Sequence, residues 1–125
     1  MGESQSTILV VEDDDDLRGP VMVIIGKLGY RVVAARSGDE ALRIVENDNG
    51  AIAVLFTDVE MPGRLDGFEL ARRATAIRPT LKVIYTTGDA GKASRTPGQV
   101  VGSILYKPYR AARLAAELRR AFDEE

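Results

Sequence analysis

Residues 51–58 are Ala-Ile-Ala-Val-Leu-Phe-Thr-Asp, an unbroken apolar run that ends on a hydroxyl and a carboxylate. The apolar part, residues 51–56, is too short for a typical helix and shows no alternation of polar and apolar positions. It therefore predicts a strand with both faces buried, in the middle of a parallel sheet. Asp58 follows at the carboxyl end of this strand, which is the end where open α/β sheets gather their functional groups.

Other short segments along the chain also have the composition of strands, and helical patterns separate them. The predicted strands cover residues 8–11, 30–35, 51–56, 81–86 and 103–106. Apolar residues recur at helical spacing over residues 17–28, 41–45, 70–77 and 114–122. Between residues 88 and 102, four glycines and a proline permit at most a short helix. The sequence thus predicts an α/β protein with a doubly wound, five-stranded parallel sheet in the order 2-1-3-4-5.

Three of the predicted helices have recognisable capping residues at their start. Ser37 and Glu40 have the spacing of a capping box, in which the hydroxyl bonds forward and the carboxylate reaches back. An aspartate of the acidic run 12–16 and Asp66 are expected to cap the first and third helices. Pro20 conflicts with the first helix, because a proline past the first turn removes a backbone hydrogen bond. A kink or a loose first turn is expected there.

The composition is that of one ordinary globular domain. The chain has 125 residues, of which 45% are hydrophobic and 29% are charged. A net charge of −2 provides no field to attract polyanions, so nucleic-acid binding is not expected. No apolar run is long enough to span a bilayer and no signal peptide is visible, so we expect a cytoplasmic protein without membrane association. Residues 1–6 are expected to form a flexible leader, and residues 7–125 the domain.

The sequence contains neither cysteine nor histidine. Disulfides, thiolate metal sites and histidine-ligated zinc or iron are therefore excluded. Any metal ion must be held by oxygen ligands, which favours magnesium, calcium or manganese.

Polar side chains from four predicted strands converge on one edge of the sheet. Glu12 and Asp13 follow the first strand, and Asp58, Thr87 and Lys107 follow the third, fourth and fifth. Each residue alone has an ordinary interpretation, as an acid at a helix start, a turn residue or a surface lysine. Together they place three carboxylates side by side, and a divalent cation such as Mg²⁺ and the lysine would offset the repulsion. The sequence therefore predicts a metal site at this edge.

Four segments resemble the signatures of the response-regulator receiver family in their order and spacing. They are Ile8–Asp14, Thr57–Gly63, Thr86–Gly88 and Tyr106–Tyr109. The resemblance covers essentially the whole chain after the first few residues. It implies a flavodoxin-like receiver fold and a signalling module of a two-component system rather than an enzyme with its own substrate.

The resemblance also implies a role for each site residue. Asp58 would accept a phosphoryl group from a phosphohistidine on a histidine kinase or a histidine phosphotransfer protein. After transfer, Lys107 would move its contact from Asp58 to a phosphoryl oxygen and Thr87 would bond another. The resulting conformational change would alter contacts with a downstream protein. No organic cofactor is expected.

The metal implied by the resemblance is Mg²⁺, with Mn²⁺ as a substitute. Its ligands would be the carboxylates of Asp13 and Asp58 and the backbone carbonyl of Glu60, while Glu12 would act through water. The Glu60 and Asp89 side chains occupy positions that tune dephosphorylation in the family. Pro108 is expected to follow a cis peptide bond, as it does in the family.

The sequence departs from the family pattern at Ile104, where many receivers carry a tyrosine or phenylalanine that changes rotamer on activation. Tyr106 and Tyr109 flank Lys107 instead. The sequence is consistent with two roles for them: a change of conformation on phosphorylation, or ordinary packing. We hypothesise that the segment from residue 89 to 98 responds to phosphorylation in place of that aromatic.

Three other functions fit parts of the sequence. A flavodoxin-like cofactor module shares the fold class, but five carboxylates in the first loop would repel a phosphate. A phosphohydrolase of the haloacid dehalogenase type would need a second aspartate two residues after Asp58, where this chain has Glu60. The stronger alternative is a receiver that is never phosphorylated and acts purely as a protein-binding module.

Overall fold

The computed structural model describes residues 7–88 and 102–123. Within these ranges five parallel strands form one sheet in the order β2-β1-β3-β4-β5, which confirms the predicted topology. The strands are β1 (Thr7–Val11), β2 (Arg31–Ala35), β3 (Ile52–Asp58), β4 (Lys82–Thr87) and β5 (Ser103–Tyr106). The helices are α1 (Asp15–Lys27), α2 (Gly38–Asn47), α3 (Gly67–Ile77) and α5 (Ala111–Asp123).

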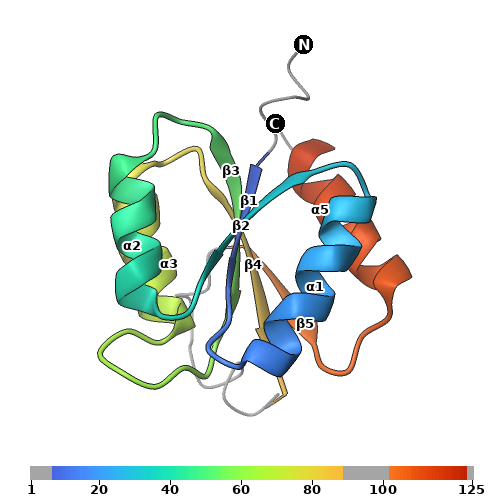
Figure 1. The fold of residues 1–125 in the computed structure, drawn as a ribbon. Coiled ribbons are helices and arrows are strands. Elements are labelled where there is room, and N and C mark those ends of the chain that lie inside the picture. The colour runs from blue at the N-terminus through green and yellow to red at the C-terminus, as the bar shows by residue number, and fades with distance from the viewer. Residues whose placement is uncertain (1–6, 89–101, 124–125) are drawn as a thin grey trace.

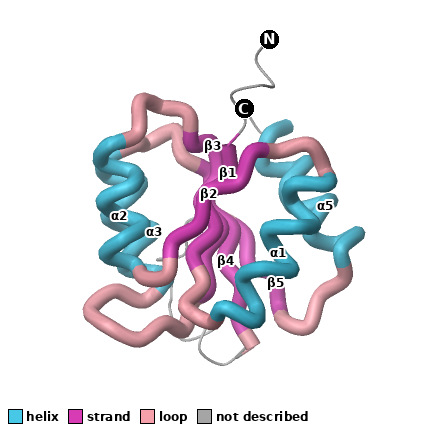
Figure 2. Tube along the Cα trace, viewed as in Figure 1, coloured by secondary structure: helices cyan, strands magenta, loops and turns pink. Residues whose placement is uncertain are grey.

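The helices cover both faces of the sheet and divide the core into two halves. Figures 1 and 2 show α2 and α3 on one face and α1 and α5 on the other. One half of the core contains Leu9, Leu55 and Tyr85, and the other contains Ile8, Phe56 and Ile84. Neighbouring positions of one strand thus serve opposite halves, because successive side chains in a strand point to opposite faces. This explains why the β3 sequence is apolar without alternation.

The strand register places the predicted site residues at one edge. Val11 pairs with Thr57, and Asp58 pairs with Thr86, so β1, β3 and β4 end almost level. Strand β4 runs one residue further than the sequence predicts, from Lys82 to Thr87. Thr87 is therefore the last residue of a strand and is fully buried.

The predicted helix caps are present, with one difference in detail. Asp14, Ser37 and Asp66 cap α1, α2 and α3 through their side-chain oxygens. The Glu40 carboxylate accepts a hydrogen bond from the backbone N–H of Arg36, at 2.7 Å, one residue earlier than the capping-box pattern predicts. Helix α1 continues through Pro20 without interruption.

Some sequence predictions lie outside the described residues. They are the flexible leader at residues 1–6 and the phosphorylation-responsive segment at residues 89–98, with Asp89. Among the helices that the structure describes, none has the length and apolar character needed to cross a membrane.

Candidate functional site

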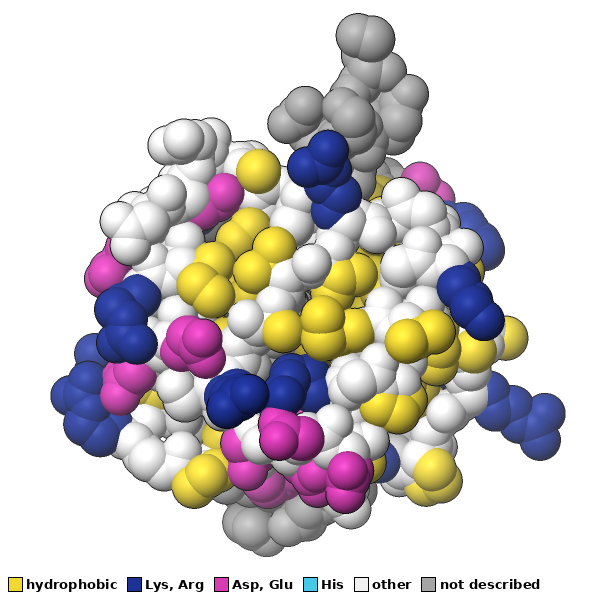
Figure 3. Space-filling view, viewed as in Figure 1, with side chains coloured by type: hydrophobic (Ala, Val, Ile, Leu, Met, Phe, Trp, Pro, Cys, Tyr) yellow, Lys and Arg dark blue, Asp and Glu magenta, His cyan; other side chains and the backbone are white. Residues whose placement is uncertain are grey.

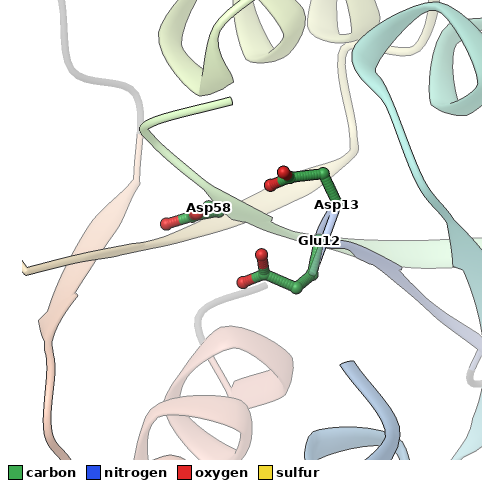
Figure 4. A group of neighbouring side chains, drawn as sticks. All are labelled: Glu12, Asp13 and Asp58. Atoms are coloured by element: carbon green, nitrogen blue, oxygen red, sulfur yellow. The ribbon is translucent and has the colours of Figure 1, made fainter. Parts of the chain in front are cut away.

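Three carboxylates meet where β1 and β3 end. Glu12 and Asp13 follow β1, Asp58 ends β3, and each contributes one carboxylate oxygen to a group whose members all lie within 4.8 Å of one another. Figure 4 shows the three side chains gathered around one space, and Figure 3 shows acidic side chains crowded at this end of the molecule. Glu12 and Asp58 are buried, whereas Asp13 is exposed. The group is therefore anchored in the protein and open to solvent on one side.

This donor set suits a hard divalent cation. Mg²⁺ prefers oxygen ligands and is commonly held by one or two carboxylates together with water. Buried carboxylates at this spacing repel one another unless a cation lies between or beside them. The described residues therefore fit the magnesium ion that the sequence predicts.

Lys107 supplies a positive charge to the same group. Its Nζ lies 3.1 Å from Asp58 Oδ1 and 3.6 Å from Glu12 Oε1. The lysine follows β5, and its backbone N–H donates to the carbonyl oxygen of Thr87 at 2.8 Å, which fixes the loop beside β4. The Lys107–Pro108 peptide bond is cis, as predicted.

Burial governs the protonation of these groups. It raises the pKa of Asp58 above its ordinary value, and the hydrogen bond and charge of Lys107 only partly oppose this increase. Burial likewise raises the pKa of Glu12, opposed by the backbone N–H of Asp14. For Lys107, burial lowers the pKa, but the hydrogen bond to Asp58 and the nearby acids outweigh it, so the net shift is upward. The lysine is therefore a permanent cation next to two carboxylates that are costly to ionise.

Two threonines end β4 beside Asp58 of β3. Thr86 Oγ1 lies 3.5 Å from Asp58 Oδ1, at the outer limit of a hydrogen bond. Thr87 Oγ1 donates to Glu60 Oε2 at 2.6 Å. The predicted hydroxyl is thus at the site, but in this structure it bonds to the side chain of Glu60.

Gly67 and Arg18 also shape the site, and neither is among the residues predicted from the sequence. A Cβ at position 67 would lie 2.2 Å from the carbonyl oxygen of Asp58, so only glycine permits this approach of α3 to β3. The Gly67 N–H donates to the Val59 carbonyl at 2.9 Å. Arg18 donates to the carbonyl of Glu12 at 3.0 Å and holds the acidic loop. In the sequence, the glycine directly after the cap residue Asp66 was the feature that could have indicated the close approach of α3 to β3.

A cavity of about 320 Å³ opens beside Asp58. Helix α1 lines one side of it, and the loop after β5 lines the other through Pro108 and Tyr109. The α1 residues at the cavity are Asp16, Leu17, Pro20, Val21 and Ile24. Burial, with the charges of Glu12 and Asp58, raises the pKa of Tyr109 to about 12, so its phenol stays neutral at physiological pH.

Position 104 packs as an ordinary core residue. Ile104 is partly buried against the half of the core that contains Tyr85, its register partner on β4. Tyr85 is fully buried and its ring lies 4.9 Å from that of Phe68 on α3. Tyr106, by contrast, is 48% exposed. The buried aromatic of this region therefore lies on β4 rather than on β5.

Comparison with known proteins gives concordant matches. A family model described as the response regulator receiver domain matches residues 8–119. The response regulator receiver protein CpdR of Brucella abortus is 35% identical over 115 residues, which cover 90% of this chain and 93% of CpdR. The sensor kinase CckA of the same organism is 32% identical over 122 residues, covering 96% of this chain and only 13% of CckA. A response regulator receiver domain protein from Clostridium thermocellum has a similar crystal structure, with a TM-score of 0.86 and 28% identity over 94% of both chains.

Proposed function

The chain belongs to the response-regulator receiver family, and we propose that it accepts a phosphoryl group on Asp58 from a phosphohistidine of a partner protein. Receiver domains are signalling modules of two-component systems, so the product of the reaction is the modified domain itself. The observation that carries the proposal is the placement of Asp58, a buried carboxylate 3.1 Å from Lys107 and grouped with Glu12 and Asp13.

In the proposed reaction an Asp58 carboxylate oxygen attacks the phosphorus of the donor. The bond between phosphorus and the imidazole nitrogen of the donor breaks, and that nitrogen leaves with the bonding electron pair. Phosphoryl transfer is promoted mainly by positioning and by stabilising negative charge on the phosphoryl oxygens. Lys107 can supply the positive charge that stabilises these oxygens, since its Nζ already contacts the attacking carboxylate.

Receiver domains bind Mg²⁺ at an acidic pocket, and the carboxylates of this chain form such a pocket. We propose that Asp13, Asp58 and the backbone carbonyl of Glu60 hold the ion, with Glu12 acting through water, and that Mn²⁺ can replace it. The bound cation would neutralise charge on the carboxylates and on the incoming phosphoryl oxygens.

The surface around the cavity favours a protein as the phosphoryl donor. Helix α1 is apolar on most sides, and only Ile25 among its residues is buried. Leu17 is exposed and lines the cavity together with Val21 and Ile24. Exposed apolar side chains next to a polar site are typical of a protein interface. We therefore infer that a histidine kinase or histidine phosphotransfer protein of the cytoplasm docks over α1 and that a downstream protein reads the modified state.

The experiment that tests the proposal is phosphorylation by acetyl phosphate, followed by intact-mass measurement. We expect the wild-type chain to gain the mass of one phosphoryl group with Mg²⁺ and none with EDTA. Asp58→Asn should gain none, whereas Asp16→Asn, which alters the same acidic run outside the carboxylate group, should behave like wild type. An adduct that persists in Asp58→Asn would contradict the assignment. Absence of any Mg²⁺-dependent adduct would favour the alternative, a protein-binding module that is not phosphorylated.

A further inference from the structure

The side chains of Glu60 and Thr87 meet beside the proposed acceptor. Thr87 Oγ1 donates to Glu60 Oε2 at 2.6 Å, across 27 positions of sequence. Thr87 is fully buried at the end of β4, and Glu60 lies two residues after Asp58 in the loop that follows β3. The contact therefore joins the acceptor loop to the neighbouring strand.

This hydrogen bond engages the only proton that Thr87 can donate. A threonine hydroxyl has a single O–H, and a carboxylate is a stronger acceptor than a neutral group. Asp58 Oδ1 takes its contacts from Lys107 and Thr86 instead. In this state the Thr87 proton is unavailable to a phosphoryl group on Asp58.

We propose that Glu60 is a positioning residue that holds Thr87 in the resting state and competes with the phosphoryl group for its hydroxyl. The inference rests on the proposed function, because it assumes that Asp58 carries the phosphoryl group. Phosphorylation of Asp58 would supply a second anionic acceptor, and the Thr87 hydroxyl would turn from Glu60 toward it. The strength of the Glu60 contact would then set how readily the phosphorylated protein reaches its active arrangement.

A second effect of Glu60 has to be separated from this one. Its carboxylate is close enough that its charge contributes to the raised pKa of Asp58, so it would also repel any anion bound there. Repulsion acts on the anion directly and does not need Thr87. The two effects therefore differ in how they depend on the hydroxyl at position 87.

A double-mutant cycle distinguishes them. The probe is beryllium fluoride, a phosphoryl mimic, titrated with excess Mg²⁺ into wild type, Glu60→Gln, Thr87→Val and the double variant, with affinity measured by calorimetry. Both substitutions keep the side-chain shape, and thermal unfolding checks that each variant is folded. We expect Glu60→Gln to bind the probe about five- to tenfold more tightly, because an amide is a weaker acceptor than a carboxylate. In the Thr87→Val background the same change should tighten binding by a smaller factor, because only the charge repulsion remains to be relieved.

Two outcomes would overturn the proposal. If Glu60→Gln tightens binding equally with threonine or valine at position 87, charge repulsion alone accounts for the effect. If Glu60→Gln leaves binding unchanged or weakens it, the resting contact does not compete with the phosphoryl group. Glu69→Gln, a control at a partly exposed acid of α3 paired with Arg72 and Arg73, should leave the affinity unchanged. Wild type that binds no probe at all would instead contradict the proposed function, and the acetyl phosphate experiment would show this independently.

Discussion

The carboxylate of Asp58 lies 3.1 Å from the ammonium group of Lys107, yet its pKa is higher than that of an ordinary aspartate. Burial is the main cause, and the negative charges of Glu60 and Asp13 add to it. One lysine therefore does not offset the loss of hydration and the repulsion between neighbouring acids. Without a metal ion, the ionised form of Asp58 is therefore unfavourable in the folded protein.

Asp58→Asn is therefore expected to raise the free energy of unfolding in metal-free buffer, by about 1 kcal/mol at pH 7. The folded protein binds the Asp58 proton more tightly than the unfolded chain does. Stability of the wild type should thus fall as pH rises from the ordinary aspartate pKa to the raised one, and this fall should be smaller in Asp58→Asn. Urea unfolding between pH 3 and pH 8, over roughly that titration range, measures both effects. A variant less stable than wild type at pH 7 would contradict this account.

Mg²⁺ is expected to stabilise the wild-type protein, because only the folded chain brings Glu12, Asp13 and Asp58 together. At a free concentration 100 times the dissociation constant, the gain is about 2.7 kcal/mol. Asp13→Asn should lose most of this gain, whereas Asp16→Asn, in the same acidic run but outside the group, should keep it. Thermal unfolding across a magnesium titration is the measurement. Equal stabilisation of both variants would place the ion elsewhere.

Gly67→Ala is expected to destabilise the protein by more than about 2 kcal/mol, because its Cβ would lie 2.2 Å from the Asp58 carbonyl oxygen. Strand β3 and α3 would have to separate, so phosphorylation by acetyl phosphate should also slow. Gly26→Ala is the matched control. A Cβ at position 26 meets nothing within 4 Å and the residue lies in α1, so alanine should stabilise by about 0.5–1 kcal/mol. Equal effects of the two changes in urea unfolding would be inconsistent with this packing.

The sheet and its order were predictable because β1, β3 and β4 are short segments rich in β-branched and other apolar residues, with both faces buried. That pattern is local and readable along the chain. The edge strand β2 mostly alternates between exposed and half-buried positions, and the predicted start at residue 30 is one residue too early. The caps at Ser37 and Asp66 were predictable for the same reason, since their partners lie three residues away.

The contacts that cross between elements could not be predicted in this way. The bond from Thr87 to Glu60 depends on the side-chain arrangement where β3 and β4 end, and strand order specifies only that the two residues are neighbours. The requirement for glycine at position 67 depends on how closely α3 approaches the Asp58 carbonyl. Likewise, Ile104 showed that an aromatic was missing from β5, but only the packing revealed Tyr85 buried opposite it.

Arg78 provides a test of stability far from the site. Its guanidinium binds Asp48 Oδ2 at 3.0 Å and the carbonyl oxygens of Asp48 and Val45 at 2.8 and 3.1 Å. Asp48 lies in the loop before β3, and Arg78 lies in the loop before β4. Both loops are at the opposite end of the sheet from Asp58. Arg78→Ala should lower the free energy of unfolding by about 2–3 kcal/mol, because half-buried acceptors lose their donor.

Arg78→Lys should lose less, about 1 kcal/mol, since lysine keeps the charge but cannot bind several acceptors in one plane. Both variants should be phosphorylated by acetyl phosphate at the wild-type rate under conditions where they remain folded. Stability is measured by urea unfolding, and the rate of phosphorylation is measured by intact mass. A slowed reaction in folded Arg78→Lys would show that the two ends of the sheet are coupled.

Tyr109 is expected to ionise at a pKa of about 12, because burial and the charges of Glu12 and Asp58 disfavour the phenolate. The measurement is absorbance of tyrosinate within milliseconds of a pH jump in metal-free buffer, before the protein unfolds. Tyr109→Phe should remove this late-titrating group, whereas Tyr106→Phe, a change at a tyrosine that is 48% exposed, should leave it in place.

The raised pKa of Tyr109 also determines how the stability of the folded protein changes at alkaline pH. The unfolded chain releases the Tyr109 proton near the ordinary value of 10, and the folded protein holds it until about 12. The contribution is therefore complete below pH 10 and is lost as pH rises from there to about 12. Tyr109→Phe should show a smaller loss of stability over this window. In Asp58→Asn the Tyr109 pKa should fall, since one of the two charges that raise it is gone. An unchanged value would mean that the charge of Asp58 does not contribute.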